Sequence, residues 1–194
     1  MNLANKLTIL RMFLVPVFLV FMAVRGIPYG SIIATVVFIL ASLTDKLDGY
    51  IARSRNQITN FGKFMDPLAD KLLVTSALVS LVELQLLPAW AAMVIIAREF
   101  AVSGLRTVAA SEGTVIAASN WGKAKTVIQI VAIILLLIKA NTGTAPLNGL
   151  INSEFLNDFF RVVPNFVMLL AVVITLISGV DYFIKNKSVI KTNK

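Results

Sequence analysis

The sequence predicts an all-α integral membrane protein with six transmembrane helices and both termini on the cytoplasmic side. Hydrophobic residues make up 58% of the chain and charged residues only 14%, against about 25% charged residues in soluble domains. The apolar residues also fall into stretches close to the roughly 20 residues that a spanning helix needs. No Ser-, Gly- or Pro-rich linker interrupts the 194 residues, so we expect one membrane-embedded domain over 1–194.

Six stretches fit spanning helices, and they lie near 9–24, 29–52, 67–87, 89–110, 121–140 and 162–184. Proline or glycine follows the first and third, as expected where a helix ends. The first stretch lacks a small-residue cleavage site, so we expect it to be retained rather than removed as a signal peptide. The sixth is the most uniformly apolar, and we expect it to serve as scaffold or dimer surface.

The positions of the basic residues predict the orientation. If both termini are cytoplasmic, all but three of the 18 Lys and Arg residues lie on the cytoplasmic side, the exceptions being Arg25, Lys139 and Arg161. Such an excess is typical of cytoplasmic loops of membrane proteins. The net charge of +8 therefore reflects topology, and we expect a lipid bilayer rather than nucleic acid as the partner. The predicted location is the cytoplasmic membrane.

Four aspartates gather where the second and third predicted helices meet. Asp45 and Asp48 are three residues apart, and Asp66 and Asp70 are four apart, so each pair shares one face of its helix. Consecutive antiparallel helices would bring the two pairs to one depth at the cytoplasmic face. Four carboxylates near a bilayer repel one another, so a positive charge must lie among them.

A pair of divalent metal ions is the best candidate for that charge. The neighbouring lysines, Lys46 and Lys71, are expected to point away from the shared faces. The chain has no His and no Cys, and oxygen ligands favour Mg²⁺ or Mn²⁺. Gly49 and Gly62 would let a ligand or another helix approach closely. The alternative is that the acids are solvated at helix ends, as Asp66 before Pro67 would be.

The spacing also resembles a family signature. Asp45-x-x-Asp48-Gly49-x-x-Ala52-Arg53, followed after eight residues by Gly62-x-x-x-Asp66-x-x-x-Asp70, is similar to the motif of the CDP-alcohol phosphotransferases. The resemblance implies the six-helix fold of that family, usually as a homodimer, and two Mg²⁺ or Mn²⁺ ions on the aspartates. It implies Asp70 as general base, and it implies residues near the donor nucleotide, namely Gly49, Ala52, Arg53 and Gly62.

A second, basic group of residues follows downstream. Arg98 and Arg106 are eight residues apart, so they share a face of the fourth predicted helix, and Lys123 and Lys125 begin the fifth. Glu99 is not expected to pair with Arg98, because adjacent positions on a helix diverge. The group would attract an anionic acceptor such as a phosphorylated alcohol. The alternative for the lysines is anchoring at the membrane interface.

This downstream segment is similar to bacterial phosphatidylglycerophosphate synthases in its Arg-Glu, Gly-Leu-Arg and Gly-Lys-x-Lys-Thr elements. Asn5-x-x-Thr8-x-x-Arg11 likewise resembles their first helix, which implies donor binding by Asn5 and Thr8. The resemblance implies transfer from CDP-diacylglycerol to sn-glycerol 3-phosphate, with Arg98, Arg106, Lys123 and Lys125 on the acceptor phosphate.

Three alternatives stay open at this point. The first is the same chemistry with inositol phosphate or phosphatidylglycerol as acceptor. The second is a divalent-cation channel or transporter, although both acid pairs at one membrane face fit a pore poorly. The third is a scaffold without activity, although every motif position is filled.

Overall fold

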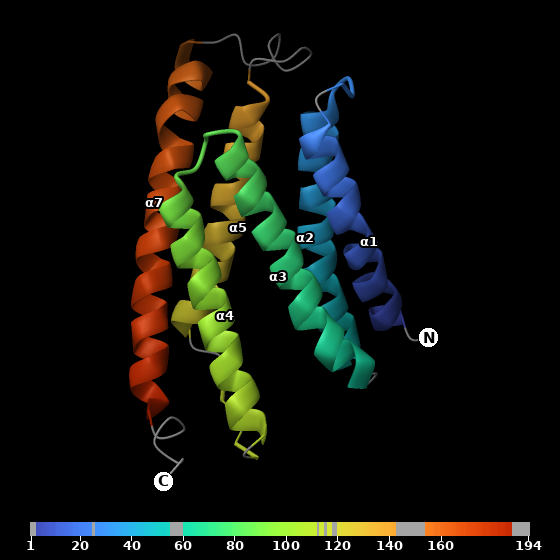
Figure 1. Ribbon diagram of the computed structural model, residues 1–194, viewed down its shortest axis with the longest axis vertical. Helices are drawn as coiled ribbons and strands as arrows, with labels where there is room; N and C mark the ends of the chain where they lie inside the picture. Colours follow the sequence, from blue (N-terminus) through green and yellow to red (C-terminus); the bar gives the residue numbers. More distant parts are fainter. Residues whose placement is uncertain are drawn as a thin grey trace.

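Helices account for nearly all of the described chain in the computed structural model (Figure 1). The structure describes residues 3–24, 26–54, 60–111, 113–114, 116–117, 120–142 and 154–187, without the side chains of 3–5, 45–54, 60–64, 66, 120 and 154. Within these residues there are six helices and no strand, which confirms the all-helical prediction. The helices are α1 (Leu3–Ala23), α2 (Gly30–Ser54), α3 (Asn60–Glu83), α4 (Ala89–Ser111), α5 (Asn120–Ala140) and α7 (Glu154–Lys185).

Several helices extend beyond the apolar stretches. α1 begins at Leu3 rather than near residue 9, and α7 begins at Glu154 rather than near residue 162. α3 begins at Asn60, so Pro67 lies inside the helix instead of at its start. Hydropathy measures the thickness of the apolar layer, whereas a helix continues as long as its backbone hydrogen bonds do. The acidic motif therefore lies on helices rather than in a loop between them.

Three helices in the described part of the chain are long and apolar enough to cross a membrane. They contain the stretches Lys6–Ala23, Trp121–Ala140 and Phe155–Lys185, and α2 contributes the shorter apolar stretch Gly30–Thr44. α4 differs because it carries Arg98, Glu99 and Arg106 along its length. The described residues contain six helices, the number of spans that the sequence predicts, and hydropathy alone marks half of these six as spans.

The helices alternate in direction and form two groups. α1 packs against α2 and α3, while α7 packs against α5 and α4; α5 also contacts α2 and α3, which joins the groups. As Figure 1 shows, this alternation brings the end of α2, the start of α3, the end of α4, the start of α5 and the end of α7 to the lower end of the bundle. Motif segments that are far apart in sequence therefore lie near one end.

Small side chains allow the helices to approach closely. The main core contains large residues such as Phe18, Phe38 and Leu78, and alanines fill many of the contact positions between helices. Small residues are typical of helix contacts in membranes, where close packing rather than hydrophobicity holds helices together. The buried alanines are Ala34, Ala41, Ala69, Ala77, Ala91, Ala92, Ala109, Ala132 and Ala171.

Large apolar side chains point outward instead. Phe13, Met93, Phe155 and Phe166 are 62–76% exposed in the isolated chain. Soluble monomers rarely expose so many large apolar groups over their surface. Together with the three apolar stretches, this surface indicates a membrane protein.

A buried amide joins the two helix groups at the end opposite the motifs. Asn141, just beyond α5, donates through Nδ2 to the carbonyl oxygen of Leu137 at 2.7 Å and to Oγ1 of Thr35 on α2 at 3.1 Å. Its Oδ1 accepts a hydrogen bond from Oγ of Ser31, also on α2. These bonds connect α5 to α2 and thereby one helix group to the other.

Replacing Asn141 with leucine should destabilise the bundle by about 1–2 kcal/mol, because buried partners on α2 lose their hydrogen bonds. The measurement is the thermal unfolding midpoint of the purified protein in detergent. Thr142→Val is the matched control, because within the described residues the side chain of Thr142 bonds to the carbonyl oxygen of Lys139 in its own turn. Equal midpoints for the Asn141→Leu variant and the parent would show that the amide does not join the groups.

Candidate functional site

A polar cavity of ≈ 250 Å³ lies between α3, α4, α5 and α7 at the motif end of the bundle. It is lined from four helices, and its charged residues come from three of them. α3 contributes a carboxylate, Asp70, and α4 and α5 contribute most of the cations. The charged lining residues are Asp70, Lys71, Arg98, Glu99, Arg106 and Lys123.

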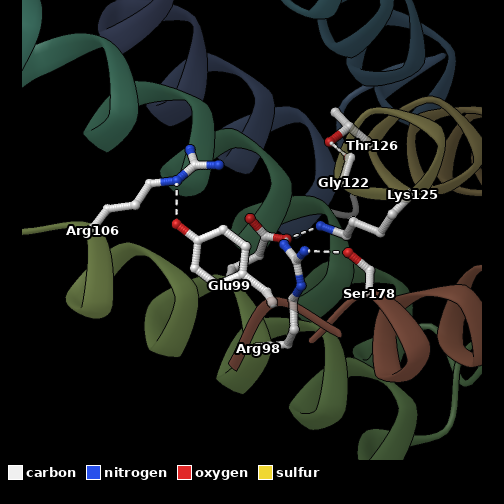
Figure 2. Close-up of polar contacts among 8 residues, drawn as sticks. Arg98, Glu99, Arg106, Gly122, Lys125, Thr126 and Ser178 are labelled. Carbon is white, nitrogen blue, oxygen red and sulfur yellow. Dashed lines mark hydrogen bonds and ion pairs between the residues drawn. The ribbon is translucent and has the colours of Figure 1, made fainter. Parts of the chain in front are cut away.

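Arg98 is held at the cavity wall by α7. Its Nη2 donates to Oγ of Ser178 at 2.6 Å, and its side chain is 12% exposed. A Cβ at position 179 would lie 3.2 Å from Cγ of Arg98, so Gly179 leaves room for the stem of the arginine. Ser178 of α7 thus helps to orient this guanidinium (Figure 2), and Gly179 leaves space for its stem.

Arg106, two turns further along α4, is also oriented by α7. Its Nε donates to the hydroxyl oxygen of Tyr182 at 3.0 Å, and its guanidinium carbon lies 5.5 Å from the centroid of the same ring. A cation over an aromatic face is stabilised by the ring quadrupole. Because only Nε takes part in the hydrogen bond to Tyr182, the forked end of Arg106 has further donors for an anion.

Glu99 lies between two cations from different helices. It forms an ion pair with Lys125 of α5, and its Oε1 accepts a hydrogen bond from Nη1 of Arg98 at 3.3 Å. Figure 2 shows the three side chains converging with Ser178. The expectation that Glu99 and Arg98 would diverge was wrong, because both side chains are long enough to meet despite the angle between adjacent Cβ positions.

The two lysines at the start of α5 differ in their surroundings. Lys125 is 2% exposed and paired with Glu99, whereas Lys123 is exposed and lines the cavity. A hydrogen bond spans the turn that holds both lysines: Oγ1 of Thr126 donates to the carbonyl oxygen of Gly122 at 3.0 Å. The sequence grouped both lysines on an acceptor phosphate, but only Lys123 reaches the cavity wall.

On α3, Asp70 and Lys71 both line the cavity. Lys71 also lies with its Nζ 5.8 Å from the ring centroid of Phe100 on α4. The expectation that Lys71 would point away was therefore wrong: its flexible stem reaches the gap between α3 and α4. Asp70 is partly buried and lies on the same cavity wall as the cations from the other half of the bundle.

Thr8 lies in a different place from the cations. It is 1% exposed on α1, and Arg11, three residues later, is fully buried on the same helix. α1 packs against α2 and α3, the helices that carry the aspartates, and neither residue lines the cavity of Arg98 and Arg106. The structure thus separates Thr8 from the basic group, and its predicted role in donor binding stays a prediction.

Most of the acidic motif lies outside the described side chains. Its backbone is helical, on α2 for the first five motif residues and on α3 for the rest. α2 and α3 contact one another, as the predicted site requires. The predicted site residues whose side chains lie outside the described part of the chain are Asn5, Asp45, Asp48, Gly49, Ala52, Arg53, Gly62 and Asp66.

Sequence reasoning missed the contribution of α7. The sixth apolar stretch was expected to act as scaffold or dimer surface, yet Ser178 and Tyr182 hold the two arginines. A signal was present: polar residues recur at Thr175, Ser178 and Tyr182, three to four positions apart on an otherwise apolar helix. The acid of this helix segment, Asp181, is not among the residues that line the cavity; it pairs with Lys185, with 2.8 Å between Oδ1 and Nζ.

Comparison with known proteins shows the family of the chain. A sequence profile described as CDP-alcohol phosphatidyltransferase matches residues 1–177. The chain belongs to this family. As a family member it is an enzyme of the phosphatidyltransferase type, and the resemblance read from the aspartate motif is confirmed.

Several relatives of this phosphatidyltransferase have been named. It is 43% identical over 203 residues to the CDP-diacylglycerol–glycerol-3-phosphate 3-phosphatidyltransferase of Bacillus subtilis, covering 99% of this chain and 98% of the relative. It is 40% identical to the probable phosphatidylglycerophosphate synthase of Mycobacterium tuberculosis (93% and 79% covered). It is 35% identical to the CDP-diacylglycerol–glycerol-3-phosphate 3-phosphatidyltransferase of Rickettsia bellii (94% and 93% covered).

Removing the charge of Glu99 should weaken the phosphatidyltransferase bundle. Glu99→Gln leaves Lys125 buried without its carboxylate, and breaking a buried pair from one side costs about 3 kcal/mol. We expect a lower thermal unfolding midpoint in detergent, with Glu83→Gln, an exposed acid at the end of α3, as the control. Adding Lys125→Met should restore most of the loss, because it removes the unpaired charge. A double variant no more stable than Glu99→Gln would contradict the pairing.

Proposed function

We propose that this enzyme transfers the phosphatidyl group of CDP-diacylglycerol to sn-glycerol 3-phosphate, giving phosphatidylglycerophosphate and CMP. The observation that carries the proposal is one cavity in which Asp70 of α3 lies with Arg98 and Arg106 of α4 and Lys123 of α5. Relatives that cover nearly the whole chain are named for this reaction. The lipid donor also suits a protein with an apolar outer surface.

The cations would bind the acceptor through its phosphate. Arg98 and Arg106 are held by hydroxyls from α7, at 2.6 Å and 3.0 Å, so their positions do not depend on the substrate. Such preorganised guanidinium groups bind a phosphate with little loss of side-chain entropy. Lys123 is exposed at the same cavity and adds a third positive charge. An uncharged alcohol acceptor would gain nothing from these groups.

Asp70 would act as the general base. It lies at the cavity wall within the same enclosure as the three cations, where the acceptor's C1 hydroxyl would be placed. The carboxylate takes the proton of that hydroxyl. The hydroxyl oxygen of the acceptor attacks the phosphorus that bears diacylglycerol. The bond between that phosphorus and the oxygen of CMP breaks, and CMP leaves. General bases of this kind contribute about 10²–10⁴-fold in rate.

Magnesium or manganese fits the residues of the acidic motif. The chain has no His or Cys, and Asp45 and Asp48 of α2 with Asp66 and Asp70 of α3 would supply hard oxygen ligands at the contact of those helices. The described residues alone hold no group of three metal-binding side chains, so the site rests on the aspartates outside them. Two bound ions would neutralise the diphosphate of the donor and align it.

The proposal includes six membrane spans with the cavity and both termini at the cytoplasmic face. α3 and α4 have 24 and 23 residues, about 35 Å of helix, which is long enough to cross a bilayer. Their charged residues Asp70, Lys71, Arg98 and Glu99 line the cavity. Because these charges face a polar cavity rather than lipid, the two helices can cross the bilayer. The excess of basic residues at this end favours the cytoplasm. The homodimer implied by the family resemblance belongs to the same proposal.

An acceptor panel tests the reaction. Purified enzyme with Mg²⁺ and CDP-diacylglycerol in mixed micelles should release CMP with sn-glycerol 3-phosphate, at a rate well above buffer, inositol phosphate or phosphatidylglycerol. A parallel reaction with EDTA should fall to the buffer rate and recover when Mg²⁺ is added. CMP release with inositol phosphate but not with glycerol 3-phosphate would overturn the acceptor assignment.

The base is tested by Asp70→Asn, which keeps the size of the side chain but removes its basicity. We expect kcat to fall at least about 100-fold while donor binding largely persists, because the amide accepts no proton. Asp181→Asn is the control, since Asp181 pairs with Lys185 outside the cavity, and it should retain parental turnover. An Asp70→Asn variant with full turnover would remove Asp70 from the reaction.

A further inference from the structure

A small recess opens beside the cavity, between α3, α4 and α5. Its volume is ≈ 20 Å³, and Asp70, Lys71, Glu99 and Thr126 line both the recess and the cavity. A space of this size holds one water-sized group. The recess thus extends the cavity on the side of the proposed base, with room for a hydroxyl and for little more.

Gln129 on α5 is one of the residues that line this recess, and its amide oxygen is buried. Its side chain is 3% exposed, and its Oε1 has no hydrogen-bond partner among the described residues. The amide follows Lys125 by one helical turn, so the two share a face of α5. Lys125 is engaged by Glu99. Buried amide oxygens in proteins are nearly always hydrogen-bonded, so this one is suited to a donor that enters the recess.

We propose that Gln129 is a specificity-determining residue that recognises the unreactive hydroxyl of the acceptor. This inference rests on the proposed function. With the acceptor phosphate at Arg98 and Arg106 and the C1 hydroxyl at Asp70, the C2 hydroxyl is on the adjacent carbon. Because Asp70 borders both spaces, a hydroxyl next to the reacting one enters the recess and donates to Oε1 of Gln129.

The size and polarity of the recess together explain why the enzyme would select one acceptor over others. A cyclic polyol would place a ring carbon and further hydroxyls where ≈ 20 Å³ is available. An acceptor without a second hydroxyl would leave the amide oxygen buried and unpaired. Sites built to hydrogen-bond a substrate hydroxyl reject analogues that lack it much more strongly than apolar pockets reject small size changes. Gln129 would therefore favour a short phosphorylated diol unit over a simple phosphorylated alcohol.

A competition between two acceptors tests the inference. The pair is sn-glycerol 3-phosphate and 3-hydroxypropyl phosphate, which has the same chain without the middle hydroxyl, and the readout is the ratio of their kcat/KM values. The parent should prefer glycerol 3-phosphate by about tenfold or more. Gln129→Met retains the length of the side chain but has no amide, so the ratio should fall toward one, mainly through loss of activity on glycerol 3-phosphate.

The matched control is Ile130→Met, which alters an apolar wall of the same recess without removing a polar atom. It should keep the parental ratio to within about twofold. Because the ratio is measured within each preparation, partial misfolding affects both acceptors alike. If Gln129→Met loses all turnover, Gln129→Asn decides, since it keeps the amide on a shorter stem and should give an intermediate ratio.

The outcomes separate the two levels of the proposal. A parental ratio in Gln129→Met or, where that variant is inactive, in Gln129→Asn would overturn the role of Gln129 while leaving the reaction intact. A parent enzyme that does not distinguish the two acceptors would overturn it as well. CMP release with neither acceptor would instead show that the proposed function has failed, and the inference would fall with it.

Discussion

The pairing of charged side chains inside an apolar helix bundle is the constraint on which the rest of the structure depends. α4 carries two arginines and a glutamate along a helix that is otherwise apolar, and charges facing lipid are costly. Glu99 offsets part of this cost because it forms ion pairs with Lys125 of α5 and with Arg98 of its own helix. Ser178 of α7 accepts a hydrogen bond from the other terminal nitrogen of Arg98, Nη2. The same contacts thus hold α4, α5 and α7 together.

Those contacts also determine which charges are available for chemistry. Lys125 forms a buried ion pair with Glu99. Arg106 and Lys123 instead line the cavity, where their N–H groups can bind an anion. The acidic motif lies on α2 and α3, in the other helix group. The proposed reaction therefore takes place at the junction of an acidic half, suited to metal and diphosphate, and a basic half, suited to an acceptor phosphate. Asp70 belongs to both, because it is part of the acidic motif and lines the cavity with the cations of the basic half.

Helical spacing predicted some of these relations and misjudged others. Arg98 and Arg106, eight residues apart, do line one cavity. Glu99 and Lys71 were expected to face elsewhere, but both reach the charged group. Spacing gives the direction of the Cα–Cβ bond, whereas a long side chain has several further rotatable bonds and follows the nearest opposite charge or aromatic ring. Predictions from spacing are therefore safest for short residues such as aspartate.

By itself, the sequence determined the all-helical class, the six helices found in the described residues, the family and the spacing of the aspartates, because hydropathy, helix periodicity and motif spacing are local properties of the chain. Only the tertiary structure decided that α7 holds both arginines, that Lys125 is buried against Glu99, and that Gln129 faces a recess beside Asp70. Each of these depends on which helices become neighbours. That choice comes from packing between distant segments, which no local pattern records.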